Sequence, residues 1–309
     1  MEDFAASGRC PVPLLIEEVE EDGKLVRPGA RAEIFWRHGR VSRQWASRAM
    51  VGIEGLAWAH SDFVGVDGLP LADLADRGVI LTNGVGNYSK PMAEWVLLGM
   101  LQAAKRFPEV IRRSDARQWE PPGTLEEMGS KVVLLLGLGS TNRLVVGPAA
   151  ALGMEVWAAV RSERPCPPGV SQMLVGDAWK DRLGEVDFLV LGLPHTPQTE
   201  RIIDAHVLSK LRPTAWVINL ARGALIDEAA LVEAVQNNSV GGALLDAFDE
   251  EPLPPSHPFW GHPNVIIVPH HSWSSPLVSQ RLPDLFFENL IRWTTGQSLL
   301  NVVDFAAGY

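Results

Sequence analysis

The sequence contains only two cysteines, Cys10 and Cys166, and they lie far apart in the chain. Neither stands at metal-ligand spacing from another ligand, so the sequence predicts no structural metal site. We interpret both side chains as ordinary thiols in a reducing compartment. The cysteine content therefore favours a cytoplasmic protein.

The chain also lacks a surplus of basic residues, because 27 Lys and Arg stand against 37 Asp and Glu for a net charge of −10. Without a basic stripe to neutralise phosphates, nucleic acid is not expected as a partner. The opening MEDFAASGRC has neither the basic lead nor the apolar segment of a signal peptide. No run approaches the ~18 apolar residues of a membrane span, so no membrane partner is expected.

What the chain does have is enough apolar residues, 46% of 309, for two domains. Residues 1–90 alternate short apolar runs with polar segments and include a candidate helix at 43–56, which predicts a small α/β domain. A helical pattern near the end indicates that residues 283–309 return to this domain. Residues 91–282 form the second domain. The candidate strands of the first domain are at 11–17, 31–36, 56–61 and 78–83.

The segment at 91–113, PMAEWVLLGMLQAAKRFPEVIRR, has apolar residues at helical spacing. It predicts one long helix with Pro91 in its first turn and a kink near Pro108. Its apolar positions exceed one face, so the helix is either deeply buried or shared with a second subunit. We expect a homodimer.

After this helix, six apolar runs are separated by segments that read as helices. Runs without alternation are typical of strands covered on both faces, as in a parallel sheet wound with helices. The pattern therefore predicts a doubly wound α/β domain. The runs are KVVLLLG, EVWAAV, VDFLVLGLP, AWVINLA, GALLDA and NVIIVPH.

The turn after the first run has the features of a dinucleotide site. Gly137 and Gly139 let the backbone approach a pyrophosphate, and the helix that begins near Ser140 and Thr141 supplies free N–H groups. The alternative is that the glycines only make a tight turn. Asn142 stands where a third glycine is expected, so its side chain must find room or push the helix outward.

A second departure lies farther along the same helix, where Gly147 and Pro148 interrupt the pattern. Proline in a helix interior removes a hydrogen bond and clashes with the carbonyl four residues back, here that of Leu144, unless the helix kinks. We expect cofactor affinity that is weakened relative to an Asn142→Gly variant but not abolished.

The end of the second run, AAVRSERP, indicates which dinucleotide binds. Val160 occupies the position of the acidic residue that contacts a ribose hydroxyl in NAD binders. Arg161, Ser162 and Arg164 follow and suit a 2′-phosphate, with Glu163 as the one opposing charge. We expect NADPH, with NADH as the alternative cofactor and a solvated turn as the competing interpretation.

Three charged or titratable residues follow other predicted strands: Arg222, Glu251 and His270. The carboxyl ends of parallel strands meet at one edge of a sheet, where ligands bind. We therefore expect these side chains to share a site. His271 competes with His270 for the role of acid and base.

At this point the chain, from about Leu56 to Tyr309, resembles the D-isomer-specific 2-hydroxyacid dehydrogenases. The motifs that carry the resemblance are GLG after a strand, LPHTPQT, NLARGALIDEAAL, LLDAFDEEPLP and VPHHSWSS, in that order. The resemblance implies a Rossmann dinucleotide-binding domain with a smaller flavodoxin-like α/β substrate domain. It also implies catalytic roles for three residues. Arg222 would hold the substrate carboxylate and polarise the ketone, His270 would act as general acid and base, and Glu251 would hydrogen-bond that histidine.

Further residues match the family less closely. Asp246 corresponds to an aspartate that contacts the nicotinamide amide, although it would serve equally to cap a turn. Val64 and Gly65 correspond to a loop whose N–H groups meet the substrate carboxylate. Asp62 adds a negative charge beside this loop, a departure that would weaken binding or select against a second carboxylate. Trp273 suggests an apolar or aromatic substrate, with a plain core tryptophan as the alternative.

The sequence thus predicts NADPH-dependent reduction of a 2-oxoacid to the D-2-hydroxyacid. The substrate would be glyoxylate, hydroxypyruvate or a bulkier 2-oxoacid. The alternative is a non-catalytic dinucleotide-sensing or scaffold protein on the same fold, because a fold alone does not establish turnover. Asn142, Pro148 and Asp62 favour this alternative, whereas Arg222, Glu251 and His270 oppose it.

Overall fold

The computed structural model describes residues 16, 18, 20, 24, 26–27, 31–39 and 41–309. The chain forms two compact units: unit 1 comprises Met1–Asn87 and Ser275–Tyr309, and unit 2 comprises Tyr88–Ser274. The domain boundaries expected after residue 90 and before residue 283 lie near these bounds. The second boundary comes earlier in the structure because the whole of α9 (Pro276–Thr294) belongs to unit 1. Cys10 and the candidate strand at 11–17, except Ile16, lie outside the described residues.

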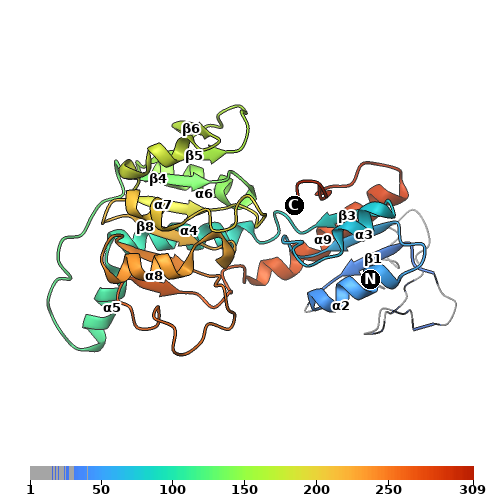
Figure 1. Ribbon diagram of the computed structural model, residues 1–309, viewed down its shortest axis with the longest axis horizontal. Helices are drawn as coiled ribbons and strands as arrows, with labels where there is room; N and C mark the ends of the chain where they lie inside the picture. The colour runs from blue at the N-terminus through green and yellow to red at the C-terminus, as the bar shows by residue number, and fades with distance from the viewer. Residues whose placement is uncertain are drawn as a thin grey trace. The chain divides into compact units, whose positions relative to one another are not determined.

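Unit 2 is built on a sheet of seven parallel strands (Figure 1). The strands lie in the order β10-β9-β8-β7-β4-β5-β6, so the chain leaves β4 on one side and later returns on the other. Such a reversal is the point at which α/β sheets bind ligands. The predicted doubly wound fold is confirmed. The strands are β4 (Val132–Leu136), β5 (Glu155–Val160), β6 (Gln172–Val175), β7 (Phe188–Leu191), β8 (Trp216–Asn219), β9 (Gly242–Leu245) and β10 (Val265–Ile267).

Helices cover both faces of this sheet, because alternate residues of β4 enter two separate cores. Leu134 packs in a core with α7 (Ala205–Lys210) and α8 (Glu228–Gln236). Leu135 packs in the opposite core with α4 (Ser89–Ala104) and α6 (Ser140–Ala151). This arrangement explains the unbroken apolar runs, since a strand buried on both faces needs no polar alternation. Three short 3₁₀ helices complete unit 2, at Ala178–Asp181, Leu183–Glu185 and Gly223–Leu225.

The edge strand β6 was not predicted from the sequence. It pairs only with β5, and two of its four residues are half-buried while Val175 is exposed. A strand with one neighbour and partial burial carries no continuous apolar run, so it leaves a weak sequence signal.

The single helix predicted at 91–113 is wrong. The structure has two helices, α4 and α5 (Phe107–Asp115), separated by Lys105 and Arg106, and Arg106 adopts a left-handed backbone with φ of 46°. Pro108 explains the break, because its ring would clash with the carbonyl of Ala104, the last residue of α4. Farther along, α6 runs without interruption through the exposed Pro148.

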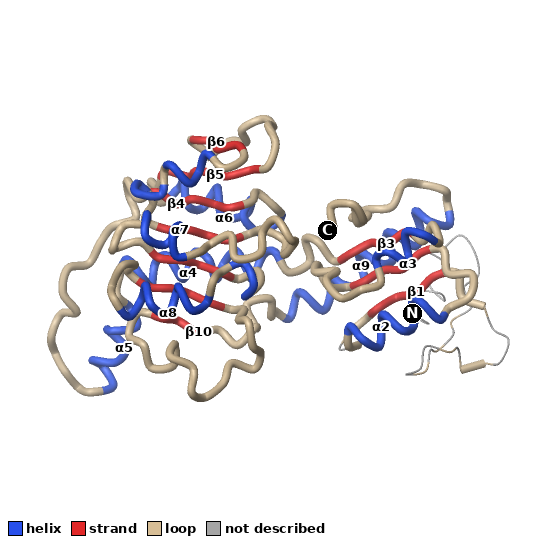
Figure 2. Tube along the Cα trace, in the orientation of Figure 1, coloured by secondary structure: helices blue, strands red, loops and turns tan. Residues whose placement is uncertain are grey.

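Unit 1 contains a parallel sheet of β1 (Ile34–Arg37), β2 (Trp58–Ser61) and β3 (Ile80–Asn83), in that order. Helices α2 (Arg43–Gly52) and α3 (Leu71–Asp76) cover one face. The other face packs against α9, which Figure 2 shows beside the strands. Phe286 of α9 stacks on Trp36 and Trp58. The register places Trp36, His60 and Thr82 side by side across the three strands.

Among the described residues, no helix combines the length and apolar character needed to cross a membrane. In the same part of the chain, no group of three or more His, Cys, Asp and Glu side chains is placed to hold a metal ion. The cytoplasmic location stays a prediction.

Candidate cofactor and catalytic site

The turn between β4 and α6 has the geometry of a phosphate loop. Gly137 has φ of +81°, and a Cβ there would lie 2.7 Å from the carbonyl oxygen of Gly192. A Cβ at Gly139 would meet nothing closer than 3.9 Å, so the fold itself does not require glycine at that position. Within the described chain, the N–H groups of Ser140 and Thr141 donate to no acceptor. An exposed glycine beside unpaired helix N–H groups fits a pyrophosphate.

Asn142 is accommodated in this turn instead of pushing the helix outward. Its side chain is 1% exposed, and its amide Nδ2 donates to the Gly137 carbonyl oxygen at 2.8 Å. Gly192 provides the space, because a Cβ there would lie 2.4 Å from that amide nitrogen. The residue that replaces the third glycine therefore links α6 to the loop.

The end of β5 presents the residues expected to select the cofactor. Val160 is buried as the last residue of the strand, whereas Arg161, Ser162 and Arg164 are exposed. Two guanidinium groups and a hydroxyl at the carboxyl edge of the sheet suit a dianionic 2′-phosphate. This match of exposure and charge fits NADPH.

Arg222 follows β8, and the backbone around it is held in place by a buried amide. Asn219, which is fully buried, donates through Nδ2 to the Arg222 carbonyl oxygen at 2.7 Å and accepts the Ala221 N–H at 3.0 Å. A Cβ at Gly223 would lie 2.2 Å from the carbonyl carbon of Phe248. The backbone position from which the Arg222 side chain extends is therefore held by hydrogen bonds and close packing.

His270 and Glu251 form a close pair beyond β9 and β10. The Nδ1 of His270 lies 2.6 Å from Oε2 of Glu251, and the other carboxylate oxygen accepts the Phe248 N–H at 3.0 Å. Trp273 donates from Nε1 to the carbonyl oxygen of His270 at 2.9 Å. The imidazole is thus oriented through one nitrogen, and Nε2 has no hydrogen-bond partner among the described residues.

The pKa shifts of this pair favour the charged forms of both groups. The hydrogen bond to Glu251 raises the pKa of His270, against the opposing effect of burial. Burial raises the pKa of Glu251, but hydrogen bonds from His270 and Phe248 outweigh it and leave the pKa below its usual value. The positive charge of Arg222 lowers both pKa values. Unit 2 therefore brings the three predicted catalytic residues within electrostatic reach of one another.

Asp246 is 2% exposed, and its carboxylate stabilises the turn that carries His270. It accepts the N–H groups of His271 at 2.7 Å and Ser272 at 3.1 Å, and also the Ser272 hydroxyl. Burial raises its pKa, and these hydrogen bonds oppose the increase. The structure thus shows the capping role, and contact with the cofactor stays a prediction. His271 is exposed, and its ring packs edge-on against Trp273.

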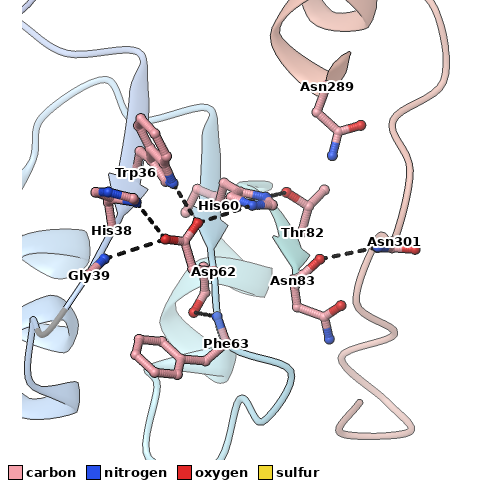
Figure 3. A network of polar contacts seen from close by, with 12 residues as sticks. Trp36, His38, Gly39, His60, Asp62, Phe63, Thr82, Asn83, Asn289 and Asn301 are labelled. Atoms are coloured by element: carbon pink, nitrogen blue, oxygen red, sulfur yellow. Dashed lines mark hydrogen bonds and ion pairs between the residues drawn. The ribbon is translucent and has the colours of Figure 1, made fainter. Parts of the chain in front are cut away.

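In unit 1, Val64 and Gly65 lie in the loop after β2, and their N–H groups donate to no acceptor among the described residues. The side chain of Asp62 is turned away from this loop and buried, with contacts to Trp36 and His38 (Figure 3). The charge expected beside this loop is therefore buried, and its effect on substrate binding stays a prediction. Tertiary hydrogen bonds draw the carboxylate toward β1.

Sequence reasoning missed the residues that hold the functional ones: Asn219 in unit 2 and Trp36 and His38 in unit 1. A weak signal was present for each. An amide ends the buried run before Arg222, and polar side chains follow the run that became β1. Nothing in a linear pattern shows which loop such side chains will meet.

A pocket of about 230 Å³ in unit 2 lies at the opposite edge of the sheet. Residues at the amino ends of strands line it, among them Phe188 and Trp216, together with Arg106 and Glu109 near α5. Ligands of parallel sheets bind at the carboxyl ends. We therefore do not assign this pocket to catalysis.

Comparison with known proteins agrees with this geometry. Residues 97–272 match the family model of the D-isomer specific 2-hydroxyacid dehydrogenase, NAD binding domain. The chain is 31% identical over 241 residues to a glyoxylate/hydroxypyruvate reductase A from Serratia proteamaculans, covering 78% of this chain and 73% of the relative.

Two solved structures are similar over most of the chain. A D-isomer specific 2-hydroxyacid dehydrogenase from Xanthobacter autotrophicus, in complex with NADPH, has a TM-score of 0.83 and 28% identity and covers 99% of this chain and 95% of its own. An NADPH-dependent glyoxylate/hydroxypyruvate reductase from Sinorhizobium meliloti, in complex with NADP and sulfate, has a TM-score of 0.78 and 28% identity. The shared lengths are 92% of this chain and 89% of that one.

Proposed function

Because the chain belongs to the D-isomer-specific 2-hydroxyacid dehydrogenases, we propose that it reduces a 2-oxoacid to the D-2-hydroxyacid with NADPH. The observation that carries this proposal is the His270–Glu251 pair at 2.6 Å, with the charge of Arg222 acting on both. A 2-oxoacid presents a carboxylate and a ketone, so its reduction needs a cation, a proton donor and a hydride. NADPH, when bound, supplies the hydride.

The chain's own residues supply the other two requirements. The planar guanidinium of Arg222 binds the carboxylate and polarises the ketone oxygen. His270, held through Nδ1 by Glu251, donates a proton from Nε2 to that oxygen. Reduction slows as the pH rises through the raised pKa of His270, because only the imidazolium form donates.

The choice of substrate rests on unit 1 and on Trp273. The unpaired N–H groups of Val64 and Gly65 suit the substrate carboxylate. Trp273 is 40% exposed, so its indole has a free surface that favours a bulkier 2-oxoacid. The named relatives favour glyoxylate and hydroxypyruvate.

NADPH is preferred in this proposal because Arg161, Ser162 and Arg164 are exposed at the end of β5, where Val160 cannot accept from a ribose hydroxyl. The NADPH and NADP complexes of the two similar structures support the same choice. A few charge-assisted contacts correspond to a preference of about tenfold or more over NADH.

The test is a screen of NADPH and NADH oxidation against glyoxylate, hydroxypyruvate, pyruvate and phenylpyruvate, followed by absorbance of the reduced cofactor. We expect turnover with at least one acid and a higher kcat/KM with NADPH. Equal or better turnover with NADH would overturn the choice of cofactor. Tight binding of NADPH without its oxidation by any of the four acids would support the non-catalytic alternative. The structure weakens two arguments for that alternative, because the side chains of Asn142 and Asp62 are both accommodated.

We also propose a homodimer formed through α4 and α5. Leu98 and Leu101 on α4 and Phe107 and Ile111 on α5 are exposed, although α4 is buried on its other side in the core of unit 2. A monomer would leave these apolar side chains in water. Light scattering should give twice the chain mass of 33.8 kDa, and a clean species at the chain mass would refute the dimer.

A further inference from the structure

A buried carboxylate joins the end of β1 to the loop after β2. Asp62 is 1% exposed, and its Oδ1 accepts the indole N–H of Trp36 at 2.8 Å. Its Oδ2 lies 2.6 Å from Nδ1 of His38 and 3.4 Å from the backbone nitrogen of Gly39 (Figure 3). Trp36 is itself held by its stack on Phe286 of α9, with ring centroids 4.1 Å apart. The carboxylate is therefore attached to a strand that packs against α9.

The neighbouring His60 does not hold Asp62 in the same way. Its Nε2 lies 3.8 Å from Oδ1 of Asp62, which is longer than a hydrogen bond, and its Nδ1 pairs with the Thr82 hydroxyl at 2.7 Å. Burial lowers the pKa of His60 to about 4, against the opposing charge of Asp62, so the ring is neutral near pH 7. Asp62 thus depends on the groups at the end of β1.

The loop after Asp62 has its carbonyl groups turned toward β3. The Phe63 carbonyl oxygen accepts the Gly84 N–H at 3.1 Å, and the Val64 carbonyl oxygen accepts Nδ2 of Asn83 at 3.0 Å. A Cβ at Gly84 would lie 1.7 Å from the carbonyl oxygen of Asp62. With the carbonyls paired on that side, the N–H groups of Val64 and Gly65 remain unpaired among the described residues. Adjacent unpaired N–H groups favour an anion.

We propose that Asp62 is a positioning residue for the substrate, which holds the Val64–Gly65 loop against the end of β1 so that its N–H groups stay directed at the substrate carboxylate. The inference rests on the proposed 2-oxoacid reduction. Burial of the Asp62 carboxylate keeps its negative charge out of the loop surface. Because its carboxylate is buried, Asp62 can lie beside the loop without preventing the loop from binding an anion.

The test compares Asp62→Ala, Asp62→Asn and His38→Ala with the parent, in steady-state reduction of glyoxylate by NADPH. Loss of charge-assisted hydrogen bonds in Asp62→Ala should raise KM by about tenfold or more, while kcat and the Kd of NADPH change little. Asparagine can accept from Trp36 and donate to His38, so Asp62→Asn should restore most of the loss. His38→Ala removes one partner of Asp62. The His38 side chain is 53% exposed, so this variant should fold and raise KM by a smaller factor.

Asn289→Ala is the matched control for general loss of stability in unit 1. Asn289 is fully buried and makes two hydrogen bonds to the backbone of Leu300, and among the described residues it makes none to residues 61–66. This variant should lower the melting temperature without raising KM. An equal rise of KM in Asn289→Ala would show that Asp62 acts only through stability and would overturn the proposal.

Hydrogen exchange of the segment 61–66 gives a readout that does not depend on turnover. Asp62→Ala should speed exchange there, and oxamate, a non-reducible isostere of pyruvate, should protect the parent more than this variant. If the parent reduces no 2-oxoacid but the loop shows these changes, the proposed reaction fails while the anchoring stands. Unchanged exchange and a KM within about twofold in Asp62→Ala would overturn the inference, whatever the activity of the parent.

Discussion

Two histidine–carboxylate pairs, one in each unit, have the same distance between Nδ1 and the carboxylate oxygen but differ in how far the carboxylate is buried. In unit 2 the His270–Glu251 pair is 2.6 Å long with side chains 45% and 35% exposed. In unit 1 the His38–Asp62 pair is also 2.6 Å long, but the side chains are 53% and 1% exposed. In the first pair the carboxylate orients an imidazole that has a free nitrogen, whereas in the second the imidazole helps to bury a carboxylate.

The difference shows that the burial of each partner, more than its identity, determines what such a pair does. The imidazole of His270, which lies next to a carboxylate that is itself partly exposed, has a raised pKa and suits proton transfer. A buried carboxylate with several N–H donors is a fixed attachment point, because removing its partners would leave a desolvated charge. Both pairs follow parallel strands at their carboxyl ends, so their position in the sheets is alike.

The largest expected effect separates the two pairs by catalysis. His270→Gln removes the proton donor and should lower kcat by about 10²- to 10⁴-fold, with NADPH binding nearly intact. His271→Gln is the matched control, since that ring is exposed and makes no hydrogen bond to Glu251. Steady-state kinetics with a 2-oxoacid that the parent reduces would measure kcat for both variants. Parent-like turnover by His270→Gln would show that the unit 2 pair is not the acid and base.

A smaller effect concerns the buried histidine of unit 1. The pKa of His60 is lowered from 6.5 to about 4 in the folded protein, so the unfolded chain binds more protons between these values. Stability should therefore fall as the pH drops from about 6.5 to about 4, by about 3 kcal/mol in total. Urea denaturation of the parent across this range would show the loss. His60→Gln should lack this component, while His206→Gln, at an exposed position, should keep it. Parallel loss in the parent and in His60→Gln would contradict the assignment.

The smallest expected effect returns to the cofactor loop. Because Asn142 donates to the Gly137 carbonyl oxygen and Gly192 provides its space, we now expect the opposite effect on affinity from the one predicted from the sequence. Asn142→Gly should weaken NADPH binding by roughly two- to tenfold, because a neutral hydrogen bond contributes about 0.5–1.5 kcal/mol. Calorimetric titration would measure the change. Adding Gly192→Ala to this variant refills part of the space without restoring the bond, so binding should stay weak. Tighter binding by Asn142→Gly would instead mean that the asparagine strains the loop.

Much of the fold was predictable because it follows from local patterns. The unbroken apolar runs of unit 2 predicted a sheet buried on both faces, and both cores are present. The strand β6 was missed because an edge strand carries little pattern. The helix break before Pro108 was missed in part, since proline permits either a kink or an end and the contacts of α4 and α5 decide between them.

The candidate site shows the same division. The order of strands and the residues that follow them placed Arg222, Glu251 and His270 at one edge from the sequence alone, because parallel strands align their carboxyl ends. The direction of the Asp62 carboxylate depends on Trp36 and His38, which lie 26 and 24 residues before it. The space for Asn142 depends on Gly192, which lies 50 residues after it. Sequence spacing determines where a backbone turn lies relative to its own strand. Only tertiary packing decides which distant N–H or empty volume a side chain meets there, since that depends on how separate elements are brought together.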